Sequence, residues 1–156
     1  MNPGLDPGER QATLAALRAL VGSCRQAEAG LRDSAAQAQA EDVRALLRRR
    51  AEDYKRQAEE LQAHVHRLAG VAADPADSVP DALWAVAHAV QPSHRDHALL
   101  AACEAAEDAA LEHYTEAAAL TLEPAAHEVI STQRLEMQRQ HALLRAMRDR
   151  LRGLGA

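Results

Sequence analysis

The sequence predicts an all-α protein that forms one domain over residues 1–156. We expect a four-helix bundle with a long crossover between the second and third helices. Four long stretches place apolar residues at alternating steps of three and four, which is the pattern of helices that bury one face. The composition includes no Phe, one Trp and two Tyr, so the core must consist mainly of Ala, Leu and Val. Such side chains favour closely packed helices over a sheet.

The first two stretches predict an antiparallel helical hairpin. Asp6 can cap the first helix and Pro7 suits its first position, and the apolar pattern continues to about Gln39. A short turn follows, which favours an antiparallel neighbour. The second helix is predicted over residues 42–68, and Gly70 is expected to end it.

Prolines interrupt the pattern once in the middle of the chain. Pro75, Pro80 and Pro92 exclude one continuous helix, so we expect a crossover that carries a short helix over residues 83–90. A long connection of this kind lets the second and third helices run parallel. The third helix is predicted from Ser93 to about residue 120, and the fourth over residues 124–152.

Two glutamates lie on stripes that are otherwise apolar. Glu28 lies on the stripe of the first helix and Glu107 on that of the third. Each follows a cysteine by four residues, and both pairs are 79 residues apart (107 − 28 = 79; 103 − 24 = 79), which indicates a repeated hairpin. A buried ionised carboxylate costs several kcal/mol unless a cation, a metal or a proton compensates it.

We therefore expect a polar layer in the middle of the bundle. Its members are Glu28, Glu107, Gln138 and His141, with hydrogen bonds from Tyr54 and Gln57. The negative charge of the two glutamates could be neutralised in two ways. A metal ion could bind the carboxylates, or Arg50 and Arg134, which share the stripes of the second and fourth helices, could neutralise them in an interior ionic network.

Several sequence segments carry a family resemblance over residues 14–151. They are Cys24 with Glu28-Ala29-Gly30, Ala58-Glu59-Glu60-Leu61 before His66-Arg67-Leu68-Ala69-Gly70, Cys103-Glu104-Ala105-Ala106-Glu107-Asp108-Ala109-Ala110 with Tyr114, and His141. With these segments the chain resembles the ferritin-like bundles, and more closely the bacterial ferritin-like family called domain of unknown function 2383. Ferritin-like bundles hold two metal ions with a Glu from each of two helices and a Glu-x-x-His from each of the other two.

The resemblance implies a degenerate di-metal site. Glu28 and Glu107 match the two single glutamates and His141 matches one histidine, whereas Tyr54, Gln57 and Gln138 stand where the other ligands are expected. Two carboxylates and one imidazole would hold two hard divalent ions poorly. The resemblance thus implies weak binding of iron or another divalent metal at Glu28, Glu107, Gln138 and His141. It says little about activity, and with three of the six ligands replaced we expect no catalysis. The alternatives are a metal-free structural or protein-interaction bundle with an interior ionic network, and a bundle that binds an apolar ligand between its helices.

Composition excludes several other classes. The net charge of −5 and the sequence pI near 5.9 give no basic signature for nucleic acid. No apolar stretch is long enough for a membrane span, and the N-terminus lacks the pattern of a secretory signal. Cys24 and Cys103 are therefore expected as free thiols in a cytoplasmic protein, on opposite sides of the polar layer. Any partner would be a second copy or another protein that contacts the helix faces.

Overall fold

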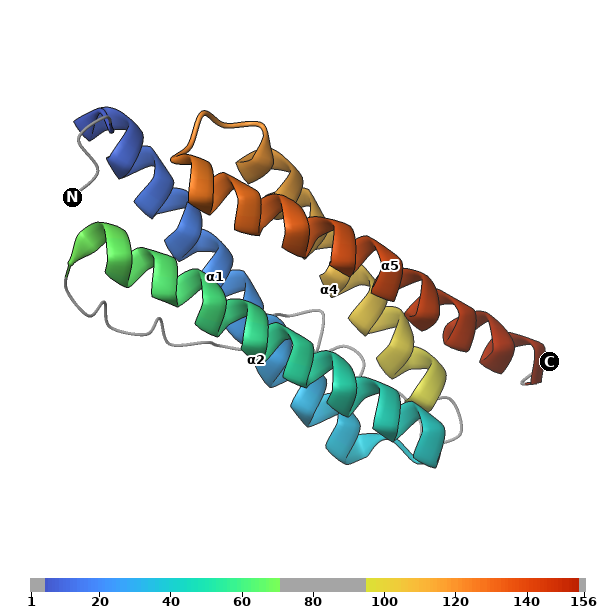
Figure 1. The fold of residues 1–156 in the computed structure, drawn as a ribbon. Helices are drawn as coiled ribbons and strands as arrows, with labels where there is room; N and C mark the ends of the chain where they lie inside the picture. Colours follow the sequence, from blue (N-terminus) through green and yellow to red (C-terminus); the bar gives the residue numbers. More distant parts are fainter. Residues whose placement is uncertain (1–4, 71–94, 155–156) are drawn as a thin grey trace.

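The structure, a computed structural model, describes residues 5–70 and 95–154 as four long helices (Figure 1). They are α1 (Pro7–Gln37), α2 (Glu41–Ala69), α4 (Arg95–Ala118) and α5 (Pro124–Leu154). The described residues contain no strand, which confirms the all-α prediction. The short helix expected over residues 83–90 lies outside the described residues. None of the described helices is long and apolar enough to cross a membrane.

The helix ends follow the local sequence. α1 begins with Pro7 directly after Asp6, although the Asp6 side chain makes no capping hydrogen bond. α2 ends at Gly70, whose φ of 69° is left-handed and whose N–H donates to the carbonyl of His66. Glycine adopts this conformation without strain, which is why it ends helices so often.

In cross-section the four helices lie at the corners of a square, and each packs against two neighbours. α1 packs against α2 and α4, and α5 packs against α4 and α2, so α2 and α4 lie on a diagonal. Cys24 contacts Tyr114 and residue 39 contacts Asp96, so α1 and α4 are antiparallel. Likewise, α5 is antiparallel to α2, since Arg67 contacts Glu123 near one end and Asp42 contacts Arg150 near the other. The second and third long helices, α2 and α4, therefore run parallel, as predicted.

Asp96 links the start of α4 to the first hairpin. Its carboxylate accepts hydrogen bonds from the backbone N–H groups of Gln39 and Ala40, at 2.8 and 2.7 Å. These N–H groups lie directly before α2, where a helix leaves its first donors without intrahelical partners. Asp96 thus stabilises the turn between α1 and α2.

The core consists largely of Leu, Ala and Val, as the composition predicted. Val65 of α2 is fully buried, whereas the neighbouring His64 is only partly buried. Cys24 and Cys103 are buried and free, as expected. Cys24 Sγ lies 3.1 Å from the Tyr114 hydroxyl, and Tyr114 is 11 residues beyond Cys103 on α4, a rise of ~16 Å. That distance excludes a disulfide between them.

Candidate functional site

A buried ion pair crosses the middle of the bundle. Arg50 of α2 is 1% exposed, and its Nε donates to Glu107 Oε1 of α4 at 2.8 Å. Its Nη1 donates to Asp53 Oδ2, also at 2.8 Å, and the guanidinium carbon lies 5.0 Å from the centre of the Tyr54 ring. Because α2 and α4 lie on a diagonal, this pair joins the two hairpins through the core. The negative charge of Glu107 is thus neutralised by an arginine from the second helix, which is one of the two possibilities considered from the sequence.

His141 forms a hydrogen bond with the other carboxylate oxygen of Glu107. Its Nδ1 lies 3.1 Å from Glu107 Oε2, and the side chain is buried between α5 and α4. A carboxylate only accepts hydrogen bonds, so Nδ1 is the nitrogen that carries a proton. This hydrogen bond raises the pKa of His141 above its ordinary value, although burial acts in the opposite direction.

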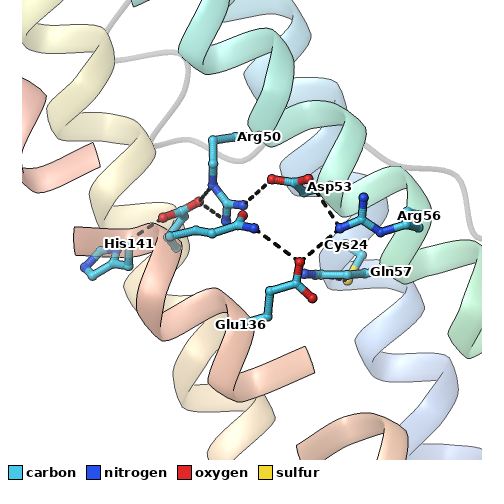
Figure 2. A network of polar contacts seen from close by, with 9 residues as sticks. Cys24, Arg50, Asp53, Arg56, Gln57, Glu136 and His141 are labelled. Carbon is cyan, nitrogen blue, oxygen red and sulfur yellow. Dashed lines mark hydrogen bonds and ion pairs between the residues drawn. The ribbon is translucent and has the colours of Figure 1, made fainter. Parts of the chain in front are cut away.

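The ion pair continues into a wider polar network (Figure 2). Asp53 contacts Arg56 at 3.4 Å, and Arg56 contacts Glu136 of α5 at 3.1 Å. Burial raises the pKa of Asp53, and the two arginines oppose that shift. The network therefore connects α2, α4 and α5 at one level of the bundle.

A group of metal-ligand type lies beside this network, between α4 and α5. We refer to Glu104, Asp108 and His141 as the triad. One nitrogen or carboxylate oxygen from each residue lies within 4.8 Å of the other two. Glu104 and Asp108 are four residues apart and share one face of α4, whereas His141 faces them from α5. Glu104 and His141 are buried, while the Asp108 side chain is 59% exposed and opens the triad to solvent.

The triad holds two buried atoms that lack aligned hydrogen bonds. His141 Nε2 lies 2.9 Å from Asp108 Oδ1, but the geometry does not form a hydrogen bond. Glu104 Oε2 is likewise buried without an aligned donor, although Arg148 Nη1 contacts it. The other oxygen, Oε1, accepts from Arg145 Nε at 3.1 Å. Buried polar atoms usually have a hydrogen-bond partner, and the triad brings two that lack one close together.

The structure places two of the predicted metal ligands elsewhere. The Glu28 carboxylate, on a side chain that is 16% exposed, pairs within its own helix with Arg25 at 3.2 Å and Arg32 at 3.1 Å. Gln138 is exposed on α5. Only Glu107 and His141, of the four predicted residues, come together. Glu28 lies at the edge of its stripe, and two arginines within one helical turn hold it there.

Tyr54 and Gln57, which were expected to supply hydrogen bonds to the layer, are both buried. Neither side chain donates an aligned hydrogen bond to it. The Tyr54 hydroxyl lies near Glu107 without an aligned hydrogen bond, and burial, followed by that carboxylate, raises the Tyr54 pKa. Gln57 Nε2 also lacks a partner among the described residues. Arg134, the other arginine considered for neutralising the layer, is only partly buried.

Sequence reasoning missed four residues of this site: Glu104, Asp108, Arg145 and Arg148. A signal for them was present in the spacing. Glu104 and Asp108 flank Glu107 on one face of α4, and Arg145 and Arg148 follow His141 by four and seven residues. Acidic and basic positions at helical spacing are usually solvated faces, and only the packing of α5 on α4 shows that these face each other.

The residues do not fit a di-metal centre of the ferritin-like kind. Arg50 and His141 each contact one oxygen of Glu107, and Glu28 is paired with two arginines of its own helix. At the level of His141, α2 contributes the cation Arg50 instead of a ligand. A guanidinium in the middle of the layer repels a metal ion at that place.

A comparison with curated proteins found no match. A comparison with protein families found one, the domain of unknown function DUF2383, whose model matches residues 12–120. The match spans α1, α2 and α4, and ends before α5. It covers well over half of the chain and agrees with the resemblance of the Cys-Glu segments on α1 and α4. This protein therefore belongs to the DUF2383 family.

Proposed function

We propose that this protein binds one divalent metal ion between α4 and α5, with Glu104, Asp108 and His141 as ligands. The observation that carries the proposal is the state of His141 Nε2. This atom is buried, lacks an aligned hydrogen bond and lies 2.9 Å from a carboxylate oxygen of Asp108. With the proton on Nδ1, Nε2 presents a lone pair to the Asp108 carboxylate, and a cation between them would remove the repulsion.

The interior ion pair supports this proposal by orienting the histidine. Metal-ligating histidines usually donate their other ring N–H to a carboxylate, which fixes the tautomer and the ring orientation. Glu107 is placed to do this for His141, and Arg50 holds Glu107 from across the bundle. In this proposal Glu107, expected from the sequence as a ligand, is a positioning residue.

The donor set indicates the class of ion. Two carboxylate oxygens and one imidazole nitrogen suit zinc, manganese or ferrous iron, and three protein ligands leave coordination positions for water. We propose weak binding, because Glu104 also contacts Arg145 and Arg148. The proposal includes no catalytic step.

Calorimetric titration of chelator-treated protein with Zn²⁺ and Mn²⁺ tests the proposal. Asp108→Asn and His141→Gln should each weaken binding at least tenfold, since each removes a ligand. Glu107→Gln should weaken it about 10–100-fold, the usual effect of losing a histidine's outer partner. Glu112→Gln, one turn from Asp108 on α4 and exposed, is the matched control and should bind like the wild type.

Glu28→Gln separates this site from the one that the sequence suggested. It should leave the affinity unchanged, because Glu28 lies outside the triad. Loss of binding in Glu28→Gln, or unchanged binding in Asp108→Asn, would overturn the proposal.

A second candidate function is a metal-free bundle that acts as a structural or interaction module. Its supporting observation is that the carboxylates of the layer already face arginines: Glu107 faces Arg50, and Glu104 faces Arg145 and Arg148. In that case saturating Zn²⁺ or Mn²⁺ would leave the melting temperature unchanged, whereas an ion that binds only the native state must raise it. Light scattering across a concentration series would then test self-association through the helix faces.

A further inference from the structure

We infer that Arg148 and the metal ion compete for Glu104, so that metal binding releases the C-terminal turns of α5 from the bundle. This inference rests on the proposed function, because it concerns the regulation of the same triad. According to this inference, α5 does more than carry His141. The attachment of its C-terminal end to the bundle depends on whether the metal site is filled.

The spacing along α5 places the competitor next to the ligand. His141, Arg145 and Arg148 follow one another at steps of four and three residues, so they share the face of α5 that packs on α4. Both arginines contact Glu104, the ligand that lies nearest the C-terminal end of α5. The metal ion and the end of the helix therefore depend on the same carboxylate.

The two arginines use different oxygens of Glu104. Arg145 Nε donates to Oε1 with hydrogen-bond geometry, which leaves that oxygen satisfied. Arg148 Nη1 contacts Oε2, which has no aligned hydrogen bond. A metal ion requires only one oxygen of the carboxylate, and Oε2 is the one whose present partner is poorly aligned. Repulsion between a divalent ion and a guanidinium makes simultaneous occupancy of Oε2 unfavourable.

Among the side chains that the structure describes, few other charged contacts hold this end of α5. Arg150 pairs with Asp42 of α2, but both side chains are 55% exposed, and ion pairs of that exposure contribute little. Glu104 is buried, so its contact with Arg148 is better shielded from solvent. Met147 and Leu151 pack only partly against the core. Loss of the Arg148 contact would therefore leave the last turns weakly attached.

Thermodynamic linkage makes the inference quantitative. If the metal weakens the contact between Arg148 and Glu104, that contact must weaken metal binding by the same factor. Couplings of this kind are typically about 5–150-fold. Arg148→Gln should therefore bind Zn²⁺ at least about fivefold more tightly than the wild type.

The experiment compares calorimetric Zn²⁺ titrations of the wild type, Arg148→Gln, Arg145→Gln and Arg150→Gln. Arg150→Gln is the matched control, because it removes the same charge from the same end of α5 without touching Glu104. We expect a large gain in affinity for Arg148→Gln, a smaller one for Arg145→Gln and nearly none for Arg150→Gln. Hydrogen exchange of the amides after Ala146 should accelerate when Zn²⁺ is added to the wild type, and should already be fast in Arg148→Gln.

The outcomes separate this inference from the proposed function. Equal affinities in Arg148→Gln and Arg150→Gln, or unchanged exchange in the wild type on addition of Zn²⁺, would overturn the competition while leaving the metal site standing. No binding by any of the four proteins would overturn the metal site itself, and the competition with it.

Discussion

Two of the clusters of arginine and carboxylate among the described residues differ in how completely their polar atoms are satisfied. The middle cluster contains Arg50, Glu107 and His141, together with the triad. The end cluster joins Arg67 and Thr13 to Glu123, the residue directly before α5. Glu123 accepts from both Arg67 nitrogens at 2.9 and 2.8 Å and from the N–H of Ala126 at 2.8 Å, while its own N–H donates to the Thr13 hydroxyl at 2.9 Å.

The end cluster is fully satisfied, whereas the middle cluster is not. The end cluster caps α5, ties it to α1 and α2, and leaves both carboxylate oxygens with aligned donors. In the middle cluster, His141 Nε2 and Glu104 Oε2 remain without them, among the residues that the structure describes. Unsatisfied buried atoms cost free energy, and our proposal places a ligand where these two converge.

The largest effect on stability is expected for Glu107→Ala. The substitution removes one of the two carboxylates that pair with buried Arg50 and leaves only Asp53, and breaking a buried pair in this way costs about 3–5 kcal/mol of the free energy of unfolding. Urea unfolding measures the loss. The double variant Arg50→Met with Glu107→Leu removes both charges and should recover most of it. A single variant as stable as the wild type would show that Asp53 alone is enough to compensate Arg50.

A smaller effect is expected for Glu123→Gln in the end cluster. Arg67 is 41% exposed and can be hydrated after the change, and the amide oxygen of Gln can still accept from Ala126. We therefore expect a loss of about 1–2 kcal/mol, from one charge-assisted pair and a weakened cap, in the same urea experiment. A loss as large as that of Glu107→Ala would contradict the distinction between the two clusters.

The end cluster should also contribute acid sensitivity. Burial acts to raise the pKa of Glu123, but the hydrogen bonds from Arg67 and Ala126 outweigh it and lower the pKa below its ordinary value. A carboxylate with a lowered folded-state pKa stabilises the protein above its unfolded pKa, and this contribution is lost as the pH falls through the folded pKa. The stability difference between wild type and Glu123→Gln should therefore shrink from pH 6 towards pH 3. A difference that stays constant over that range would contradict the pKa shift.

The smallest effect is expected for Glu28→Gln. Its partners Arg25 and Arg32 are partly exposed, and pairs of this kind contribute about 1 kcal/mol or less. Thermal unfolding in low and high salt measures this contribution, which screening should reduce further. A cost near that of Glu107→Ala would mean that Glu28 belongs to the interior layer after all, as the stripe had indicated.

The comparison also shows how far sequence reasoning reached. The apolar stripes predicted four helices, and Pro7, Gly70 and Pro124 predicted ends within a few residues of those observed, because helix ends depend on local backbone preferences. The stripes identified Glu107 and His141 as buried but misplaced Glu28 and Gln138. A side chain at the edge of a stripe can turn inward or towards solvent, and the stripe does not contain that information.

The sequence by itself determined the helices, their ends, the aliphatic core and the parallel course of α2 and α4. The tertiary structure decided which charges meet. Arg50 reaches Glu107 across the diagonal of the bundle, and His141 faces Glu104 and Asp108 because α5 packs against α4 at that level. Helix formation depends on neighbours within one or two turns, whereas these contacts depend on the relative height and rotation of helices far apart in the chain, which the packing of the whole core sets.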